Sequence, residues 1–183
     1  MILKVFVKRI YEELLNNYFD VFEVFEGEII DPYDSGINTG KAIIVEVPTE
    51  IVSEEAVYLL DGELNVSSRG ELMLSARTII PERLTAGWNS LMTTVISRRG
   101  RIVNGFSALS ASFDNSYQFT DLLLPELVLW GELADVKIGT EMVVYGRFEV
   151  SRYGINFAVK GKKIINQCTE LEKYLNEHND NDM

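Results

Sequence analysis

Alternating apolar and polar residues predict strands over most of this chain. The alternating runs are residues 21–30, 41–47, 56–66, 71–80, 91–97, 101–106, 117–124, 141–150 and 155–165. Runs of this period bounded by Gly, Pro, Asn and Asp are typical of strands with one buried face. Two segments, Arg9–Phe19 and Thr169–Asn179, instead place apolar residues at helical spacing. The pattern predicts a mainly β protein with short terminal helices.

A nine-residue pattern occurs twice in the chain. Gly62–Gly70 and Gly146–Gly154 share the pattern G-x-[LF]-x-V-S-x-x-G at a separation of 84 positions. Chance or shared turn chemistry is the alternative to a duplication, but the similar flanking residues favour one small β unit built twice. After the second glycine, Leu72 and Leu74 are one residue out of step with Phe157 and its neighbours. The repeat therefore predicts an insertion or a bulge in one copy.

Composition indicates a soluble protein. The chain has 183 residues, of which 46% are hydrophobic, and no apolar run of about 18 residues. Met1–Ile10 carries three basic residues and fits neither a membrane span nor a signal peptide. Cys168 is the only cysteine, which excludes an internal disulfide and agrees with a reducing compartment. We therefore expect a cytoplasmic protein with no membrane partner.

Charge divides the chain into three parts. Residues 1–87 carry 7 basic and 16 acidic residues, residues 88–166 carry 9 and 7, and residues 167–183 carry 1 and 5. With Pro81–Gly87 as the linker, this predicts an acidic unit with an N-terminal helix at residues 1–84, a more basic unit at 88–166, and an acidic C-terminal helix or tail at 167–183. Because phosphate is attracted to basic residues, any nucleic acid is expected to bind to the second unit.

No catalytic site is predicted from the sequence. His178, the only histidine, lies in a polar tail, and there is no phosphate-binding loop, paired-histidine motif or nucleophile elbow. Carboxylates are spread through surface-like positions, which does not favour a metal site. Ala76–Leu84 has some similarity to nucleotide-hydrolysing trimers of the dUTPase type, but their other motifs are missing. We expect no catalytic residues, metal or cofactor, and keep a hydrolase on a β barrel only as a third class.

The segment Lys137–Ile164, KIGTEMVVYGRFEVSRYGINFAVKGKKI, resembles the last two strands of OB-fold barrels in replication protein A and related single-strand binding proteins. The matching positions are Gly139, Val144, Gly146, Gly154 and Ile164. The resemblance covers about 30 residues, is weaker at residues 56–80 and is only topological elsewhere. It implies two tandem small OB-like barrels and is compatible with an accessory subunit of an archaeal replicative DNA polymerase.

OB-fold proteins bind single strands across one barrel face and with the loops between strands 1 and 2 and between strands 4 and 5. In the second unit we assign these loops to Arg98–Arg101 and Ser151–Gly154. The candidate nucleic-acid-binding residues are Arg98, Arg99, Arg101, Tyr145, Arg147, Arg152, Tyr153, Lys160 and Lys162. Alternatively, the three arginines of the first loop are hairpin charges paired with the acidic unit, and Tyr145 is a core residue. Trp88 and Trp130 are expected in the core or in packing between units rather than as base platforms.

These observations predict a non-enzymatic accessory subunit of DNA replication or repair. We expect it to dock on a DNA polymerase or on a complex resembling replication protein A, with weak contact to single-stranded DNA. Its partners would be proteins of the replication and repair machinery, because a net charge of −11 is unusual for a free coating protein. The rival hypothesis is a structural or assembly protein, viral or scaffold, that uses paired β barrels for protein contacts.

Overall fold

The computed structural model describes residues 1–14, 21–33, 36–48, 51–113, 119–151 and 154–167. In these residues the first half of the chain forms β1 (Ile2–Leu14), β2 (Val21–Asp31), β3 (Ala42–Val47), β4 (Val57–Val66) and β5 (Leu72–Pro81). A short helix, α1 (Glu82–Thr85), follows. The second half forms β6 (Asn89–Val103), β7 (Phe106–Phe113), β8 (Leu127–Gly131), β9 (Glu141–Ser151) and β10 (Gly154–Asn166).

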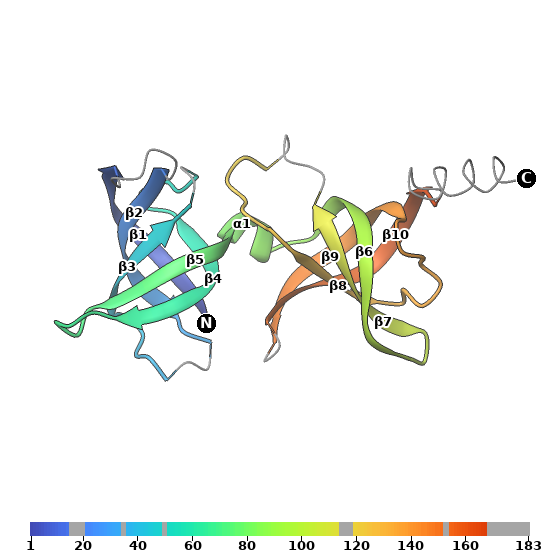
Figure 1. The fold of residues 1–183 in the computed structure, drawn as a ribbon, viewed down its shortest axis with the longest axis horizontal. Helices are drawn as coiled ribbons and strands as arrows, with labels where there is room; N and C mark the ends of the chain where they lie inside the picture. Colours follow the sequence, from blue (N-terminus) through green and yellow to red (C-terminus); the bar gives the residue numbers. More distant parts are fainter. Residues whose placement is uncertain (15–20, 34–35, 49–50, 114–118, 152–153, 168–183) are drawn as a thin grey trace, which may run out of the picture. The chain divides into compact units, whose positions relative to one another are not determined.

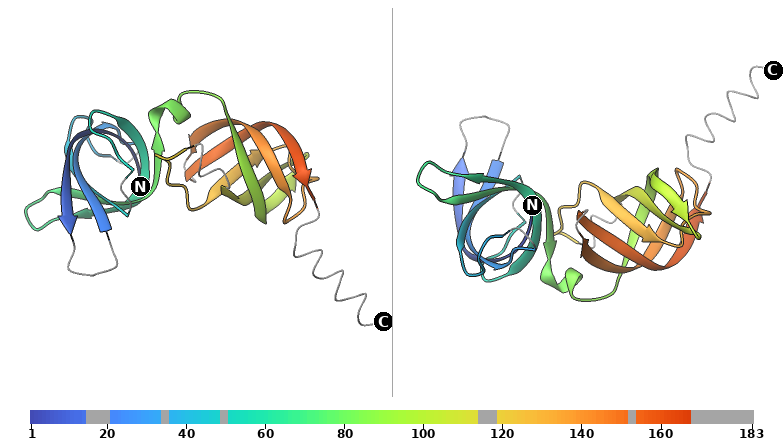
Figure 2. Two further views of the ribbon diagram at one scale, coloured as in Figure 1. Left: turned by 90° about the horizontal axis from the view of Figure 1, so that it is seen from above. Right: turned by 90° about the horizontal axis from the view of Figure 1, so that it is seen from below.

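The two sets of five strands form two closed barrels with the same connectivity (Figure 1). The first barrel has the order β1-β2-β3-β5-β4 and closes through β4 and β1. The second has the order β6-β7-β8-β10-β9 and closes through β9 and β6. In each, the third and fifth strands run parallel, and the closed course of the strands can be followed in Figure 2. The prediction of a mainly β chain with two tandem OB-like barrels is confirmed.

Alternation of side chains along the strands builds most of the core of each barrel. In β3 every second residue is buried, and in β9 the buried positions are Met142, Val144, Gly146 and Phe148. Because successive side chains in a strand point to opposite faces, one apolar set fills the barrel and the other faces outward. In the second barrel Phe148 and Phe157 meet edge to face inside the core, with ring centroids 5.2 Å apart.

The repeated glycines occupy equivalent places in the two barrels. A Cβ built on Gly62 of β4 would lie 2.1 Å from the carbonyl oxygen of Ser75 in β5, and one built on Gly146 of β9 would lie 1.9 Å from that of Ala158 in β10. Only glycine allows the fifth strand to approach so closely. Ser75 comes 13 positions after its glycine and Ala158 comes 12 positions after its own. The one-residue offset predicted from the sequence is therefore present.

Four predicted elements are wrong where the structure describes them, one of them the strand at residues 101–106, which is interrupted between β6 and β7. Residues 9–14 are not helical but belong to β1, because they continue its antiparallel ladder with β2 as far as the pair Leu14 and Val21. The turn predicted at residues 98–100 lies within β6, and residues 119–124 form no strand apart from an isolated bridge between Leu123 and Ile79. The predicted helix Thr169–Asn179 lies outside the described residues.

Contacts divide the chain into two compact units whose boundaries are not continuous in sequence. Unit 1 comprises Met1–Ala86, Tyr117–Pro125 and Val150–Ile155, and unit 2 comprises Gly87–Ser116, Glu126–Glu149 and Asn156–Met183. Residues 119–125, which follow β7 in the described part of the chain, are held in unit 1 by paired backbone hydrogen bonds between Leu123 and Ile79 and by a bidentate ion pair between Arg83 and Asp121. The guanidinium holds the pKa of Asp121 below its ordinary value by hydrogen bonding.

Candidate nucleic-acid interface

The outer face of strands β6, β7 and β8 carries a cross-strand row with an arginine and a tryptophan. Arg99 pairs with Ala108, Ala108 pairs with Trp130, and Trp130 pairs with Ala158 of β10. Residues directly opposite one another in neighbouring strands share a face of the sheet. Arg99 is exposed and Trp130 has 43% of its surface exposed, so this row faces outward. We call the surface made by Arg99, Phe106, Ala108 and Trp130 the aromatic face.

Phe106 and Trp130 form the apolar part of the aromatic face. Their rings stack with centroids 6.1 Å apart and an interplanar angle of 29°, and Phe106 is 38% exposed. Small residues, Ala108 and Ser110, follow Phe106 on the same side of β7. Both rings are thus partly exposed to solvent, while Ser110 is buried and donates a hydrogen bond to Glu126.

Three exposed cations lie on the strands next to the two rings. Arg99 lies on the cross-strand row, and its Nη1 is 3.7 Å from Oε1 of Glu126, with both side chains more than half exposed. An ion pair so open to water is weak, about 0–1 kcal/mol, and can exchange for a phosphate contact. Arg101 on β6 and Lys160 on β10 are exposed and make no ion pair with another described residue. Lys160 lies on the same side of its strand as Ala158, the partner of Trp130.

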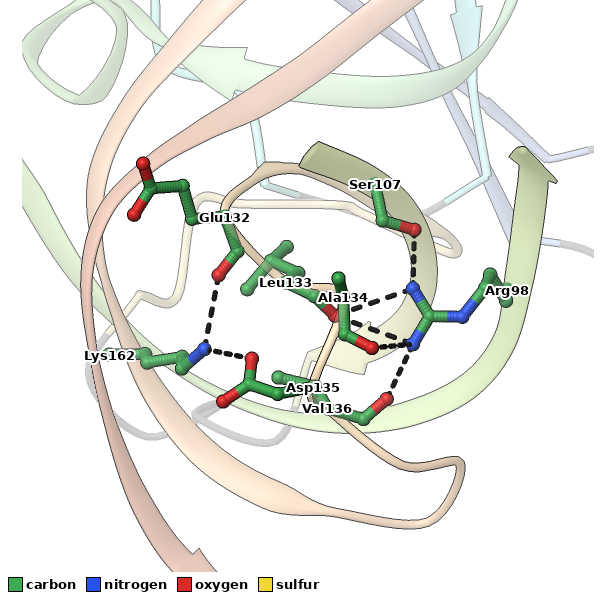
Figure 3. Close-up of polar contacts among 8 residues, drawn as sticks. All are labelled: Arg98, Ser107, Glu132, Leu133, Ala134, Asp135, Val136 and Lys162. Carbon is green, nitrogen blue, oxygen red and sulfur yellow. Dashed lines mark hydrogen bonds and ion pairs between the residues drawn. The ribbon is translucent and has the colours of Figure 1, made fainter. Parts of the chain in front are cut away.

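Arg98, in contrast, is a structural residue. Its guanidinium donates hydrogen bonds to the hydroxyl of Ser107 and to the carbonyl oxygens of Leu133, Ala134 and Val136, the last at 2.6 Å (Figure 3). The side chain is half-buried, and its donors are used in holding the connection between β8 and β9. We therefore remove Arg98 from the candidate phosphate contacts.

Lys162 has the same kind of role. Its Nζ donates to the carbonyl oxygen of Glu132 at 3.0 Å and lies 2.7 Å from Oδ1 of Asp135. This hydrogen bond holds the pKa of Asp135 below its ordinary value, so the carboxylate stays charged. Figure 3 shows Arg98 and Lys162 reaching residues 132–136 from opposite sides. Leu133 and Val136 of this segment are buried in the core. The hydrogen bonds of Arg98 and Lys162 therefore hold a segment that contributes to the core.

Tyr145 and Arg147 lie on a different part of the barrel, around Trp88. Tyr145 stacks on Trp88 with centroids 5.5 Å apart, and the guanidinium of Arg147 lies 5.6 Å from the centre of the same ring. Arg147 also pairs with Glu149 at 3.5 Å. Tyr145 is exposed, so its interpretation as a core residue is wrong. The last two candidates, Arg152 and Tyr153, lie outside the described residues.

Two features of the interface were missed in the sequence. Trp88 and Trp130 were expected to be packed away, yet 49% and 43% of their surfaces are exposed. The hairpin turn between β6 and β7 is Asn104–Gly105, whose φ angles of 51° and 83° are those of a type I′ turn. An Asn-Gly dipeptide is the strongest short hairpin signal. It would have placed Phe106 at the start of β7 and Arg98–Arg101 inside β6.

The corresponding face of the first barrel has the opposite charge. Glu26 and Glu28 on β2 and Glu46 on β3 occupy alternate, half-buried positions on the outside of these strands. Tyr11 donates a hydrogen bond to Glu26, and Ser75 donates one to Glu46. Phosphate would be repelled from this surface. The charge difference predicted from the sequence is thus located on the equivalent strands of the two barrels.

The described residues contain no group of three or more His, Cys, Asp or Glu side chains placed to hold a metal ion. The only histidine and the only cysteine lie outside those residues. In the same part of the chain, no helix has both the length and the apolar character needed to cross a membrane.

No protein-family model and no curated protein matches the chain. Among solved structures it is similar to the single-stranded DNA binding protein from Thermus aquaticus, with 11% identity, a TM-score of 0.36 and coverage of 90% of this chain and 92% of the other. It is also similar to fission yeast Pot1 in a structure with single-stranded DNA, with 11% identity, a TM-score of 0.31 and coverage of 95% and 88%. A third match is p202 HIN2, with 12% identity, a TM-score of 0.29 and coverage of 91% and 92%. At these TM-scores, the description of each unit as an OB-like barrel rests on its own strand order.

Proposed function

We propose that this protein is a non-enzymatic accessory subunit of DNA replication or repair whose second barrel contacts single-stranded DNA weakly. It docks on a DNA polymerase or on a complex resembling replication protein A. The DNA contact is the aromatic face, with Phe106 and Trp130 stacking on bases and with Arg99, Arg101 and Lys160 contacting phosphates. The tandem OB-like architecture is suited to this role because such barrels bind oligonucleotides across their second and third strands.

The observation that carries the proposal is the exposed Phe106–Trp130 stack on β7 and β8. Stacking of a base on an aromatic side chain is worth about 1–3 kcal/mol and tolerates any base. Two such rings and three cations give a modest total, since Glu126 competes for Arg99 and the chain carries a net charge of −11. We therefore expect weak binding with little sequence preference.

The test is fluorescence anisotropy of a labelled dT oligonucleotide of about 16 nucleotides, the upper range for one OB barrel, titrated with the full chain. Trp130→Ala should weaken binding by about 5- to 150-fold, the equivalent of 1–3 kcal/mol. Trp88→Ala is the matched control, because it removes the other exposed tryptophan, which stacks on Tyr145 instead. It should leave the affinity within about twofold of the native protein.

Salt dependence measures the phosphate contacts separately. Three contacts predict a slope of about −2 for log K against log of the salt concentration. Arg99→Ala should reduce the magnitude of that slope by about 0.7. Equal losses for Trp130→Ala and Trp88→Ala, or binding that does not depend on salt, would contradict the assignment of the aromatic face to DNA.

A second candidate function is a structural or assembly protein, favoured by exposed aliphatic side chains on the second barrel. Ile96, Ile102, Val103 and Ile138 are each about half exposed or more. Exposed apolar residues mark a protein interface when they form a continuous patch. This alternative predicts self-association in sedimentation velocity that Ile138→Glu abolishes, together with no binding of the dT oligonucleotide.

A further inference from the structure

The first barrel has a hollow of about 300 Å³ on its outer surface. It is lined by Lys41–Ile44 at the start of β3, by Gly70–Leu72 at the start of β5 and by Glu26 of β2. The hollow therefore lies beside the second and third strands of the barrel, next to the hairpin between its fourth and fifth strands. OB folds place ligands on this side, but here the surface does not suit nucleic acid.

The hollow arises where two parallel strands separate. β3 and β5 pair over only three positions, from Ile44 with Met73 to Glu46 with Ser75. Ala42 and Ile43 extend β3 beyond this pairing and have a partner strand only on the β2 side in the described part of the barrel. The other edge of β3 is thus open at this point. Open strand edges accept an extended peptide by main-chain hydrogen bonding.

Side chains around the open edge combine apolar contact with negative charge. Ala42 and Ile44, on the outward face of β3, provide apolar contact within the hollow, while Glu26 and Glu71 supply two carboxylates against the single cation of Lys41. Glu28 and Glu46 flank it on the same strands. Glu28 has an exposed ion pair with Lys8 at 3.4 Å, a contact that a ligand cation can replace at small cost. Residues 1–87 as a whole carry a net charge of −9, so the long-range field has the same sign.

We propose that this hollow is the docking site for an extended basic segment of a protein partner, in which Lys or Arg alternates with apolar residues. Alternation is required because successive side chains of an added strand point to opposite sides. Apolar side chains enter the hollow over Ala42 and Ile44, and the basic ones lie against Glu26 and Glu71. The inference rests on the proposed accessory role and names the chemistry of the partner surface that this role requires.

The experiment titrates the full chain into a fluorescein-labelled peptide of about ten residues that alternates Leu and Lys. A peptide with Ser in place of Leu tests the apolar contribution. Glu71→Lys reverses an exposed charge in the hollow, and Glu55→Lys makes the same charge change in the connection between β3 and β4, outside it. Because both variants have equal net charge, a difference between them reports the site and not general attraction to an acidic protein.

The proposal predicts that the Leu-Lys peptide binds and the Ser-Lys peptide binds more weakly, and that Glu71→Lys lowers affinity about fivefold more than Glu55→Lys does. No binding of the Leu-Lys peptide, or equal losses in the two variants, would overturn it. Binding of dT oligonucleotide is measured on the same samples. If the native protein binds DNA but not the Leu-Lys peptide, the proposal that the hollow binds a peptide is refuted and the DNA contact is not. If it binds the peptide but not DNA, the proposed DNA contact is refuted and the peptide site is not.

Discussion

Replacement of Gly146 by alanine should strongly destabilise the second barrel. The added Cβ would lie 1.9 Å from the carbonyl oxygen of Ala158 and 3.1 Å from Cε1 of Phe157. Normal contacts between such atoms are about 3.5 Å, so β9 and β10 would have to separate locally by roughly 1.5 Å. Neighbouring strands are only about 4.8 Å apart, and a shift of this size breaks hydrogen bonds between them.

The magnitude follows from two destabilising contributions and one stabilising contribution. Overpacking costs about 1–3 kcal/mol, and two lost backbone hydrogen bonds cost about 1 kcal/mol each. The lower backbone entropy of unfolded alanine returns about 0.5–1 kcal/mol. The expected loss in the free energy of unfolding is about 2–4 kcal/mol. For a barrel of this size, that lowers Tm by about 10–25 °C.

Urea unfolding followed by tryptophan fluorescence is the assay, because both tryptophans belong to the unit that contains Gly146. Gly161→Ala is the matched control, since a Cβ at that position in β10 would meet no atom within 4 Å. Gly62→Ala should have an effect of similar size on the first barrel, measured by far-UV circular dichroism. A Gly146→Ala protein as stable as Gly161→Ala would refute the reasoning.

Three further predictions concern single side chains. Arg98→Met should lower the free energy of unfolding by about 2–3 kcal/mol in urea titrations, because the carbonyl oxygens of Leu133, Ala134 and Val136 lose their donor, while affinity for dT should stay unchanged. Asp121→Asn should lower Tm above about pH 5, and its difference from the native protein should shrink below pH 3.8, because the lowered pKa of Asp121 gives stability that is lost on protonation. Thr140→Val should be neutral or raise stability by up to about 1 kcal/mol in thermal melts, since the buried Thr140 hydroxyl has no hydrogen-bond partner in the described structure.

Each of these predictions has a contradicting result. Arg98→Met would contradict the structural role if it kept native stability and lost DNA binding. For Asp121→Asn, a Tm difference that stays constant from pH 7 to pH 3 would show that the ion pair with Arg83 does not set the stability. A loss of more than about 1 kcal/mol in Thr140→Val would show that the hydroxyl has a partner after all.

The repeat made the fold predictable from sequence. Gly62 and Gly146 mark the same close approach of the fourth and fifth strands, and a sequence can report this because only glycine satisfies it. The one-residue offset after the repeated turn was also visible in the sequence, because a shift of one residue moves every apolar side chain to the other face of its strand. Elements that depend on such local steric requirements can be predicted from the sequence.

Elements set by pairing with a neighbouring strand were not predictable. Residues 9–14 have helical spacing, but the ladder with β2 makes them a strand, and local propensity is a weak determinant beside such pairing. Arg98 and Arg99 are adjacent in sequence, yet one is fixed to the carbonyl oxygens of residues 133–136 and the other faces solvent. Composition cannot separate them, because the difference depends on which face of β6 each side chain uses.

The most direct test of the DNA-binding account uses the two indole N–H signals of the chain in a two-dimensional NMR spectrum. Trp88 and Trp130 are the only tryptophans, so substitution of either one assigns both signals. On titration with the dT oligonucleotide, the Trp130 signal should move in a saturable manner while the Trp88 signal stays in place. Movement of Trp88 alone, or no movement of Trp130 at an excess of oligonucleotide, would contradict the account.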